Sequence, residues 1–428
     1  MSASPSVRER VLAAASDVTE EALDFAAALV RIPTVNPPGE AYADAARVIA
    51  ERLERGGFAV RVLPAEGRPE HTERHPRPNV LGVLEGEASG PCLHLNGHYD
   101  VVPPGEGWSV DPFAGLVRDG RLYGRGACDM KAGLAAAVYA AEAVRRAGVR
   151  LRGRLELSGT VDEESGGFAG VAWLCERGFI VRGRTDYVII PEPFGPDRVC
   201  VGHRGAWWFA LTTHGRIAHG SMPHLGTSAI DHMAALLEAV RLELKPALAA
   251  RTTRMPVVPP ESRRATLNVN TVFGGQAGEA VQTPCVADRC TAIFDRRFLP
   301  EEGLAGARRE LLDLVARVQE KLPELRFEIE DRMVVHPVET PADSPLVAAL
   351  ARAIREVCGR EAALVASPGS YDHKHVARIA GVEQCVAYGP GRLELAHQPD
   401  EYCEVADLAA SIQVLALAIV ELVGVAGG

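Results

Sequence analysis

The stretch LHLNGHYD, residues 93–100, places an apolar strand directly before two side chains that can take part in metal chemistry. Residues two apart on an extended backbone point the same way, so His98 and Asp100 are expected to face one side. An imidazole can bind a metal ion, and a nearby carboxylate can orient the ring. This pattern alone is weak, because a strand-end histidine followed by a turn aspartate has the same sequence.

Strand and helix signals alternate on both sides of this stretch. We expect helices over 42–55 and 131–147 and strands over 58–63, 151–161 and 185–190. Such alternation predicts an α/β fold in which a mixed sheet lies between helices.

The order of the elements changes near position 202, where strands and helices begin to follow one another as in an α+β module. The simplest organisation is a catalytic domain in two parts, 1–201 and 336–428, interrupted by an inserted α+β module over 202–335. No internal repeat is visible.

The composition is that of an ordinary globular protein. Of 428 residues, 47% are hydrophobic and 24% are charged, which is enough apolar material for a substantial core. The formal net charge is -10 and no block of Lys and Arg stands out, so nucleic acid is not expected as a partner.

The cysteines and the apolar segments indicate a cytoplasmic protein. The nine cysteines show no C-x-x-C spacing, which fits a reducing compartment, and the N-terminus lacks the pattern of a secretory signal. The apolar segment 405–425 contains Asp407, Gln413 and Glu421, so we expect a packed helix there and no membrane contact.

Four further stretches carry groups that can bind metal or move protons. Asp129 stands at the expected start of the 131–147 helix, and an acidic pair follows the 151–161 strand at Glu163 and Glu164. Glu192 lies between two prolines at a strand end, and His397 precedes the last helix. Taken singly, each has an ordinary explanation as a helix cap, a solvated acidic turn or a loop residue.

The combination of these residues points to a metal centre. His98, Asp129, Glu164, Glu192 and His397 supply two imidazoles and three carboxylates, all at strand ends or loops of one α/β layer. This donor set suits two divalent ions, with zinc expected and cobalt or manganese as alternatives. In the adjacent pair, one carboxylate would bind metal and the other would take a proton from water.

At this point the chain resembles the aminoacylase / acetylornithine deacetylase / succinyl-diaminopimelate desuccinylase family of two-metal hydrolases. Seven stretches carry the resemblance, and they occur in the family's order. They are LNGHYDVVP (95–103), LYGRGACDMKAG (122–133), TVDEESGG (160–167), PEP (191–193), AHGSMPHLGTSAI (218–230), DRRFLP (295–300) and AHQPDEY (396–402).

The resemblance implies a fold and a role for each residue of the centre. The fold would be a zinc-exopeptidase-like catalytic domain with an inserted lid and dimerisation domain. His98 and Glu192 would bind one metal ion, Glu164 and His397 the other, and Asp129 would bridge them. Asp100 would orient His98, and Glu163 would be the general base and acid.

The resemblance also implies roles for the inserted module and the substrate loop. His219 would donate to the oxyanion from the partner subunit of a homodimer formed through residues 202–335, and Arg297 would grip a substrate carboxylate. Tyr371 and Asp372 are expected to contact the substrate.

The chain departs from the family pattern in three places. The stretch 278–284 lacks the Asn that family members often carry, and Ala132 stands where Gly is usual. The loop around Tyr371 and Lys374 also differs from the common Gly-Thr-Asp-Ala-Arg type, which suggests a different substrate.

Three functions are compatible with the sequence. The first is a metal-dependent hydrolase that cleaves the amide C–N bond of a small, carboxylate-bearing substrate, as a deacylase of N-acyl amino acids or as a peptidase. The second is an aminohydrolase that releases ammonia from a non-peptide substrate such as an aromatic amine. The third, a non-catalytic binding protein, predicts loss of Glu163 or of a ligand, and none is lost.

Overall fold

The computed structural model describes residues 5–275 and 284–427, and the chain divides into two compact units. The first unit comprises Met1–Gly202, Thr340–Val365 and Tyr371–Gly428, and the second comprises His203–Glu339 and Ala366–Ser370.

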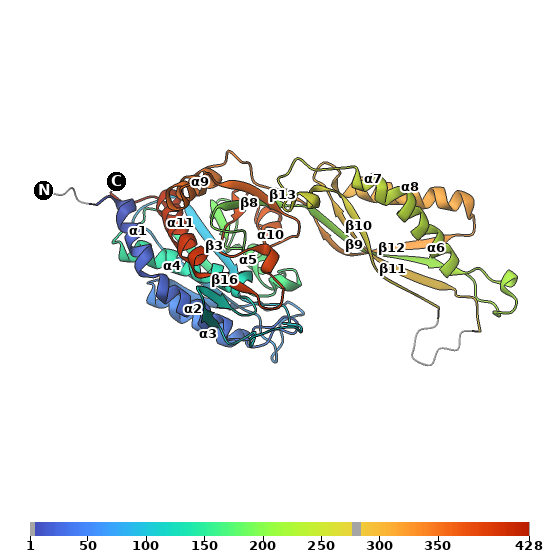
Figure 1. Ribbon diagram of the computed structural model, residues 1–428, viewed down its shortest axis with the longest axis horizontal. Coiled ribbons are helices and arrows are strands. Elements are labelled where there is room, and N and C mark those ends of the chain that lie inside the picture. The colour runs from blue at the N-terminus through green and yellow to red at the C-terminus, as the bar shows by residue number, and fades with distance from the viewer. Residues whose placement is uncertain (1–4, 276–283, 428) are drawn as a thin grey trace. The chain divides into compact units, whose positions relative to one another are not determined.

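The first unit is a mixed sheet with helices packed against it (Figure 1). Its helices are α1 (Val7–Asp17), α2 (Thr19–Val30), α3 (Tyr42–Arg55), α4 (Ala132–Arg146), α5 (Val171–Glu176), α9 (Pro345–Cys358), α10 (His373–Arg378) and α11 (Val405–Val423). Its main strands are β1 (Ala59–Pro64), β2 (Pro78–Leu84), β3 (Cys92–His98), β6 (Arg154–Thr160), β7 (Tyr187–Ile190), β8 (Arg198–His203), β14 (Ala363–Ser367) and β15 (Cys385–Ala387). A separate small sheet is formed by β4 (Leu116–Arg118), β5 (Arg121–Tyr123) and β16 (Tyr402–Glu404).

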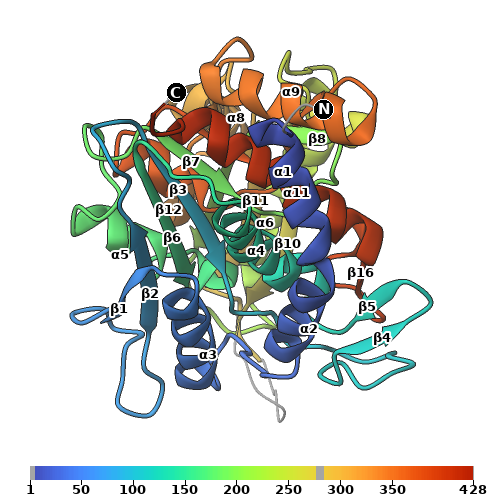
Figure 2. The same ribbon diagram turned by 90° about the vertical axis from the view of Figure 1, so that its left-hand side faces the viewer.

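The strand order of the main sheet explains where the predicted site residues meet. Within the first unit the order is β1-β2-β6-β3-β7-β15-β8, with β14 beside β8, and the neighbours β2, β6, β3 and β7 can be followed in Figure 2. β3 pairs in parallel with both β6 and β7, so the carboxyl ends of these three central strands lie at one edge. In a parallel arrangement this edge is where loops gather functional side chains.

Helices α3 and α4 cover the same face of this sheet. Gly97 of β3 and Gly159 of β6 are direct neighbours across the two strands. A Cβ on Gly97 would touch Leu134 of α4, and a Cβ on Gly159 would touch Ile49 of α3. Glycine at these two positions therefore lets both helices approach the sheet closely.

Helix α11 is long and apolar enough to cross a membrane by length and composition alone, yet 61% of its most apolar window is buried inside the protein. It packs against α1, α4 and α9. It therefore has the character of the packed helix expected from the sequence.

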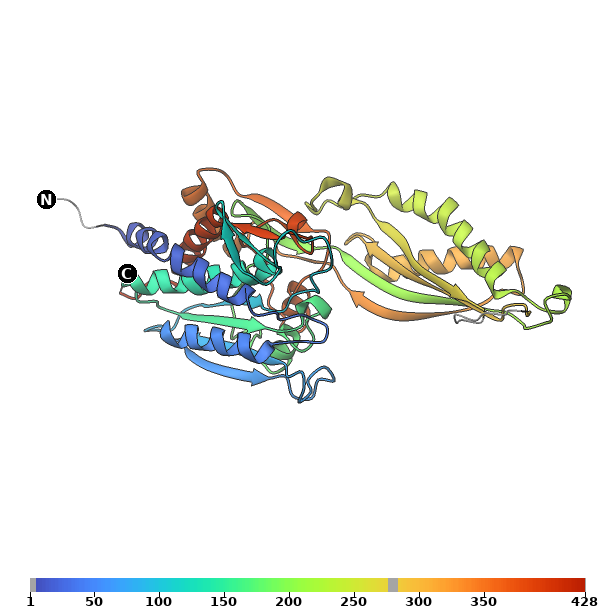
Figure 3. The same ribbon diagram turned by 60° about the horizontal axis from the view of Figure 1, so that its bottom comes forward.

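The second unit is an α+β module built on an antiparallel sheet in the order β10-β11-β9-β12. Its elements are β9 (Gly205–His214), β10 (Thr266–Gly274), β11 (Arg289–Phe298), β12 (Arg326–Val335), β13 (Val338–Glu339), α6 (Ala229–Ala239), α7 (Lys245–Ala249) and α8 (Gly303–Lys321). Helices α6 and α8 pack on one face of the sheet, over a core that includes Phe209 and Phe294 (Figure 3). The predicted fold class, an α/β domain with an inserted α+β module, is confirmed.

The bounds of the second unit lie close to, but not at, those expected from the sequence. It extends from 203 to 339, compared with the expected 202–335, and it also includes the short segment 366–370. This segment joins the unit through Ala366, whose backbone N–H donates to the carbonyl of Pro256 at 2.8 Å and whose carbonyl accepts from Val258 at 3.0 Å. The role of this unit as a lid and dimerisation domain stays a prediction.

Helix α4 begins in close contact with the turn after β7. A Cβ on Gly133 would lie 1.8 Å from the carbonyl oxygen of Pro191, the residue before Glu192. By contrast, a Cβ on Gly306, which is also in a helix, would meet open space. Position 133 therefore cannot accept a methyl group without a shift of the backbone, whereas position 306 can.

Replacing Gly133 by Ala should lower the free energy of unfolding by about 3 kcal/mol, because a backbone carbonyl must move to make room. Gly306→Ala is the matched control and should be neutral or stabilising by up to about 1 kcal/mol, since alanine is the better helix former. Urea unfolding followed by circular dichroism measures both. Equal stability of the two variants would contradict the close approach of α4 to Pro191.

Candidate metal centre

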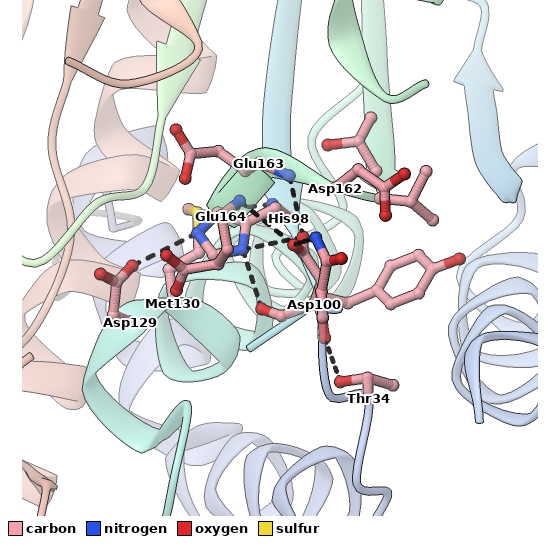
Figure 4. Close-up of polar contacts among 12 residues, drawn as sticks. Thr34, His98, Asp100, Asp129, Met130, Asp162, Glu163 and Glu164 are labelled. Atoms are coloured by element: carbon pink, nitrogen blue, oxygen red, sulfur yellow. Dashed lines mark hydrogen bonds and ion pairs between the residues drawn. The ribbon is translucent and has the colours of Figure 1, made fainter. Parts of the chain in front are cut away.

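His98 is the last residue of β3 and lies buried at the carboxyl edge of the main sheet. Its Nδ1–H donates to the backbone carbonyl of Asp100 at 3.1 Å, and the Asp100 carboxylate lies 3.4 Å from the same nitrogen. In the neutral ring this leaves a lone pair on Nε2, which faces Oδ1 of Asp129 at 3.3 Å (Figure 4). A histidine that binds metal through Nε2 needs this tautomer.

The carboxylate of Asp100 also binds the backbone of the turn after β6, a contact that the sequence did not predict. Its Oδ1 accepts the backbone N–H of Glu163 and its Oδ2 that of Glu164, both at 3.1 Å (Figure 4). Asn36 donates to Oδ2 as well, at 3.0 Å. One buried carboxylate therefore connects the end of β3 to the turn that follows β6.

Asp129 lies in a π-type turn, Ala127–Lys131, ahead of α4. Its backbone is not helical and α4 has no side-chain cap, so Asp129 is not an ordinary helix-capping residue. The N–H groups of Cys128 and Asp129 donate to Oε1 of the buried Glu401 at 2.8 and 3.0 Å, and Arg125 pairs with the other oxygen of Glu401. Glu401 thus fixes the turn that presents Asp129.

Glu163 and Glu164 occupy a short 3-10 turn, Glu163–Ser165, after β6. The two carboxylates have different partners. Oε1 of Glu164 lies 3.1 Å from Nε2 of His397, which is also 3.5 Å from Oδ2 of Asp129, whereas Oε1 of Glu163 lies 3.6 Å from Nζ of Lys374. The adjacent acids are therefore not a solvated acidic turn.

Glu192, which follows β7, is buried and influenced by the same groups. Burial raises its pKa well above the usual range, and the charge of Asp129 raises the pKa further. Burial likewise raises the pKa of Glu163, and raises that of Glu164 to about 8. Hydrogen bonds with Asp129 and Glu164 raise the pKa of His397 to about 10.

These residues fit divalent cations. The ligand atoms of His98, Asp129 and Glu164 lie within 4.8 Å of one another, close enough to share an ion. Burial and the charge of Asp129 raise the pKa values of Glu164 and Glu192, and a bound cation would favour the ionised form of both carboxyls. Imidazole nitrogen together with carboxylate oxygen is a donor set that zinc, cobalt and manganese accept.

The predicted substrate contacts in the first unit are buried. The hydroxyl of Tyr371 lies 3.4 Å from the carbonyl oxygen of Cys200, and Oδ2 of Asp372 accepts from Asn96 at 3.0 Å. Their role in substrate binding stays a prediction. The departure noted at 278–284 lies, Pro284 apart, outside the described residues.

The two predicted residues of the second unit each have a local partner. Nδ1 of His219 accepts from the N–H of Ser221 at 3.1 Å, which leaves Nε2–H as a donor on an exposed ring. Arg297 pairs with Asp295 through two bonds of 2.8 and 3.0 Å. The functions expected of both residues stay predictions.

Three further side chains lie at the site, and the contacts they make there were not predicted from the sequence. Glu401 is part of the stretch AHQPDEY, so a signal existed, but nothing in the sequence indicated that it holds the Asp129 turn. Lys374 and His375 belong to α10, and His375 donates from Nε2 to the carbonyl of Gly166 at 2.7 Å. Only the fold brings α10 to the turn that carries Glu163.

Comparison with known proteins identifies relatives over most of the chain. Residues 94–421 match the model of Peptidase family M20/M25/M40. The chain is also 31% identical over 415 residues to a succinyl-diaminopimelate desuccinylase of Gluconacetobacter diazotrophicus, and the alignment covers 94% of this chain and 97% of the relative. These matches confirm the resemblance inferred from the motifs.

Solved structures with the same fold include two peptidases. The di-peptidase Dug1p of Saccharomyces cerevisiae superposes with a TM-score of 0.75 at 16% identity, covering 97% of this chain and 98% of that chain. A dinuclear metal-binding peptidase of the M20 family from Bacillus subtilis superposes with a TM-score of 0.65 at 17% identity, covering 95% and 99%. At such identities these matches establish the fold alone.

His375 predicts a pH dependence of stability. Burial lowers its pKa to about 4, so as the pH falls below about 6.5 the unfolded chain takes up the proton first and the folded state loses stability. His375→Gln keeps a donor for Gly166 and does not titrate. Between pH 7.5 and 5, the wild-type free energy of unfolding should fall by about 2 kcal/mol more than that of His375→Gln at equal metal content. Parallel pH profiles of the two proteins would contradict the neutral, buried state of His375.

Proposed function

We propose, given that the chain belongs to peptidase family M20/M25/M40 and is a metal-dependent hydrolase of amide bonds, that it removes the acyl group from a small N-acylated amino acid. The name of the desuccinylase relative makes an N-succinyl amino acid the first substrate to test. A dipeptide, which has the same amide bond next to a carboxylate, is the second.

The observation that carries this proposal is the different surroundings of the two adjacent acids. Glu164 pairs with His397 and belongs to the cluster of ligand atoms, while Glu163 stands beside it without joining that cluster. Asp100 fixes both backbones through their N–H groups. Glu163 is therefore held next to the place where the metal ions would bind, with its carboxylate left for proton transfer.

In the proposed reaction the chain's own residues hold the ions and move the proton. His98 and Glu192 would hold one ion, Glu164 and His397 the other, and Asp129 would contact both. Zinc, the ion we propose, would lower the pKa of a water at the centre and polarise the scissile carbonyl.

Glu163 takes a proton from the attacking water on a carboxylate oxygen and returns it to the leaving nitrogen. The water oxygen adds to the carbonyl carbon to form the C–O bond, and the C–N bond then breaks as the nitrogen takes up the proton, so the products are a carboxylic acid and an amine. His219, through Nε2–H, would donate to the carbonyl oxygen as negative charge develops there. Arg297 would bind the substrate carboxylate with the N–H groups of its guanidinium that Asp295 leaves free.

We further propose that the enzyme works in the cytoplasm as a homodimer formed through residues 202–335. All nine cysteines are unpaired, which supports a reducing compartment.

The reaction is tested with a panel of N-succinyl and N-acetyl amino acids, dipeptides and aromatic amines, measuring acyl acid, free amine and ammonia. We expect acid and amine to be released, and Glu163→Gln to lower kcat by about 10²–10⁴-fold, the usual contribution of general acid–base catalysis. Arg378→Met, a change at an exposed position of α10 in the first unit, is the control and should be silent. Release of ammonia without an acyl acid would instead establish an aminohydrolase.

Removal of the metal should lower both activity and stability. After dialysis against a chelator we expect no activity, a lower melting temperature, and recovery of both with zinc. An ion at 100 times its Kd adds about 2.7 kcal/mol to the folded state. His397→Ala should weaken this stabilisation, because it removes one expected ligand. Recovery with manganese or cobalt but not with zinc would change the assigned metal, and full activity after chelation would contradict the metal centre.

A further inference from the structure

The turn that carries Glu163 is contacted from one side by the first residues of α10. His375 donates from Nε2 to the carbonyl of Gly166 at 2.7 Å, and Nζ of Lys374 lies 3.6 Å from Oε1 of Glu163. Oδ1 of Asp372 lies so close to Gly167 that a Cβ there would approach it to 2.6 Å. Three of the first four residues from Asp372 onward thus touch the segment 163–167.

The start of α10 is in turn fixed to the central strands. Nδ2 of Asn96, on β3, donates to Oδ2 of Asp372 at 3.0 Å, and the side-chain Oδ1 of Asn96 accepts from the Ser158 hydroxyl of β6 at 2.7 Å. His94 lies 2.7 Å from the Ser158 hydroxyl and 3.1 Å from Glu156. All of these side chains are buried, so the chain of hydrogen bonds gives α10 a rigid attachment to the sheet.

Lys374 therefore extends toward Glu163 from a helix whose start is fixed to the sheet. Its side chain is only 9% exposed, so the long stem is confined and the ammonium has little freedom to move away. A single ion pair formed by a lysine at the surface would contribute little to stability, because solvent screening and the loss of side-chain entropy oppose it. Here packing has already restricted the stem, and the charge acts on a carboxylate that is itself nearly buried.

We propose that Lys374 is a positioning residue for Glu163, holding the carboxylate in the orientation from which it reaches the attacking water. The inference rests on the proposed function, in which Glu163 is the base. A base must lie within hydrogen-bond reach of the proton it takes, and displacement by about 1 Å can cost about 10²-fold in rate. Lys374 does not touch the reacting atoms in this role.

The test compares Lys374→Met with Lys374→Arg and with Arg378→Met, a change at an exposed position of the same helix, in the zinc-loaded, full-length enzyme. Lys374→Met removes the charge and keeps the length, so we expect kcat to fall by about 10–100-fold while KM stays within about twofold. Lys374→Arg should recover most of kcat, because it restores a cation. Metal content should be the same in all variants, and Arg378→Met should behave as wild type.

Amide hydrogen exchange of the zinc-loaded proteins gives a second readout that requires no substrate. Loss of the ion pair should speed exchange in peptides that cover residues 163–168 in Lys374→Met, and Lys374→Arg should restore protection. This measurement tests the positioning role even if the enzyme hydrolyses no compound of the substrate panel. Unchanged exchange in Lys374→Met would overturn the proposal.

The kinetic outcomes separate this inference from the proposed function. Loss of activity in Glu163→Gln with a normal kcat in Lys374→Met would keep the base and overturn the positioning role. A raised KM with normal kcat in Lys374→Met would assign Lys374 to substrate binding, and loss of metal would assign it to the metal centre; both overturn the proposal. An active Glu163→Gln would refute the proposed base itself.

Discussion

The buried carboxylate of Asp100 is the group on which the arrangement of the site depends. A charge removed from water is tolerated only when hydrogen bonds replace its hydration. Asp100 gains them from the backbone of Glu163 and Glu164 and from Asn36, and it lies beside the ring of His98. The same bonds that make its burial tolerable bring the ends of β3 and β6 into one fixed geometry.

Around this carboxylate the site gathers more acids than the protein itself can neutralise. Burial raises the pKa of Glu163, Glu164 and Glu192, although Lys374 lies near Glu163 and His397 near Glu164. A fold gains nothing from such crowding unless cations enter it. The two neighbouring glutamates have different partners, because the Glu164 side chain turns toward His397 and the Glu163 side chain toward Lys374. Position on the turn, rather than residue type, gives the two acids the different partners on which their proposed roles rest.

Some of this could be predicted because it is local in the sequence. The strand that ends in His98, the helix over 131–147 and the acidic pair after a strand are each encoded within a few residues. Seven motifs in a fixed order then indicated the family, which the comparisons confirm, and implied a ligand set that stays a prediction. Other partners could not be read in this way, since Glu401 and Asp129 are far apart in the chain and meet only because β16 pairs with β5.

The sequence by itself determined the chemistry available to this protein, namely two imidazoles, a set of carboxylates and the strands that end in them. The tertiary structure alone decided which group orients which. It gave Asp100 its hydrogen bonds to the turn that carries Glu163 and Glu164. It also brought α10, more than 200 positions away in the sequence, against that turn. The physical reason is that hydrogen bonds and ion pairs act over a few ångströms, and only the packed sheet brings distant segments within that range.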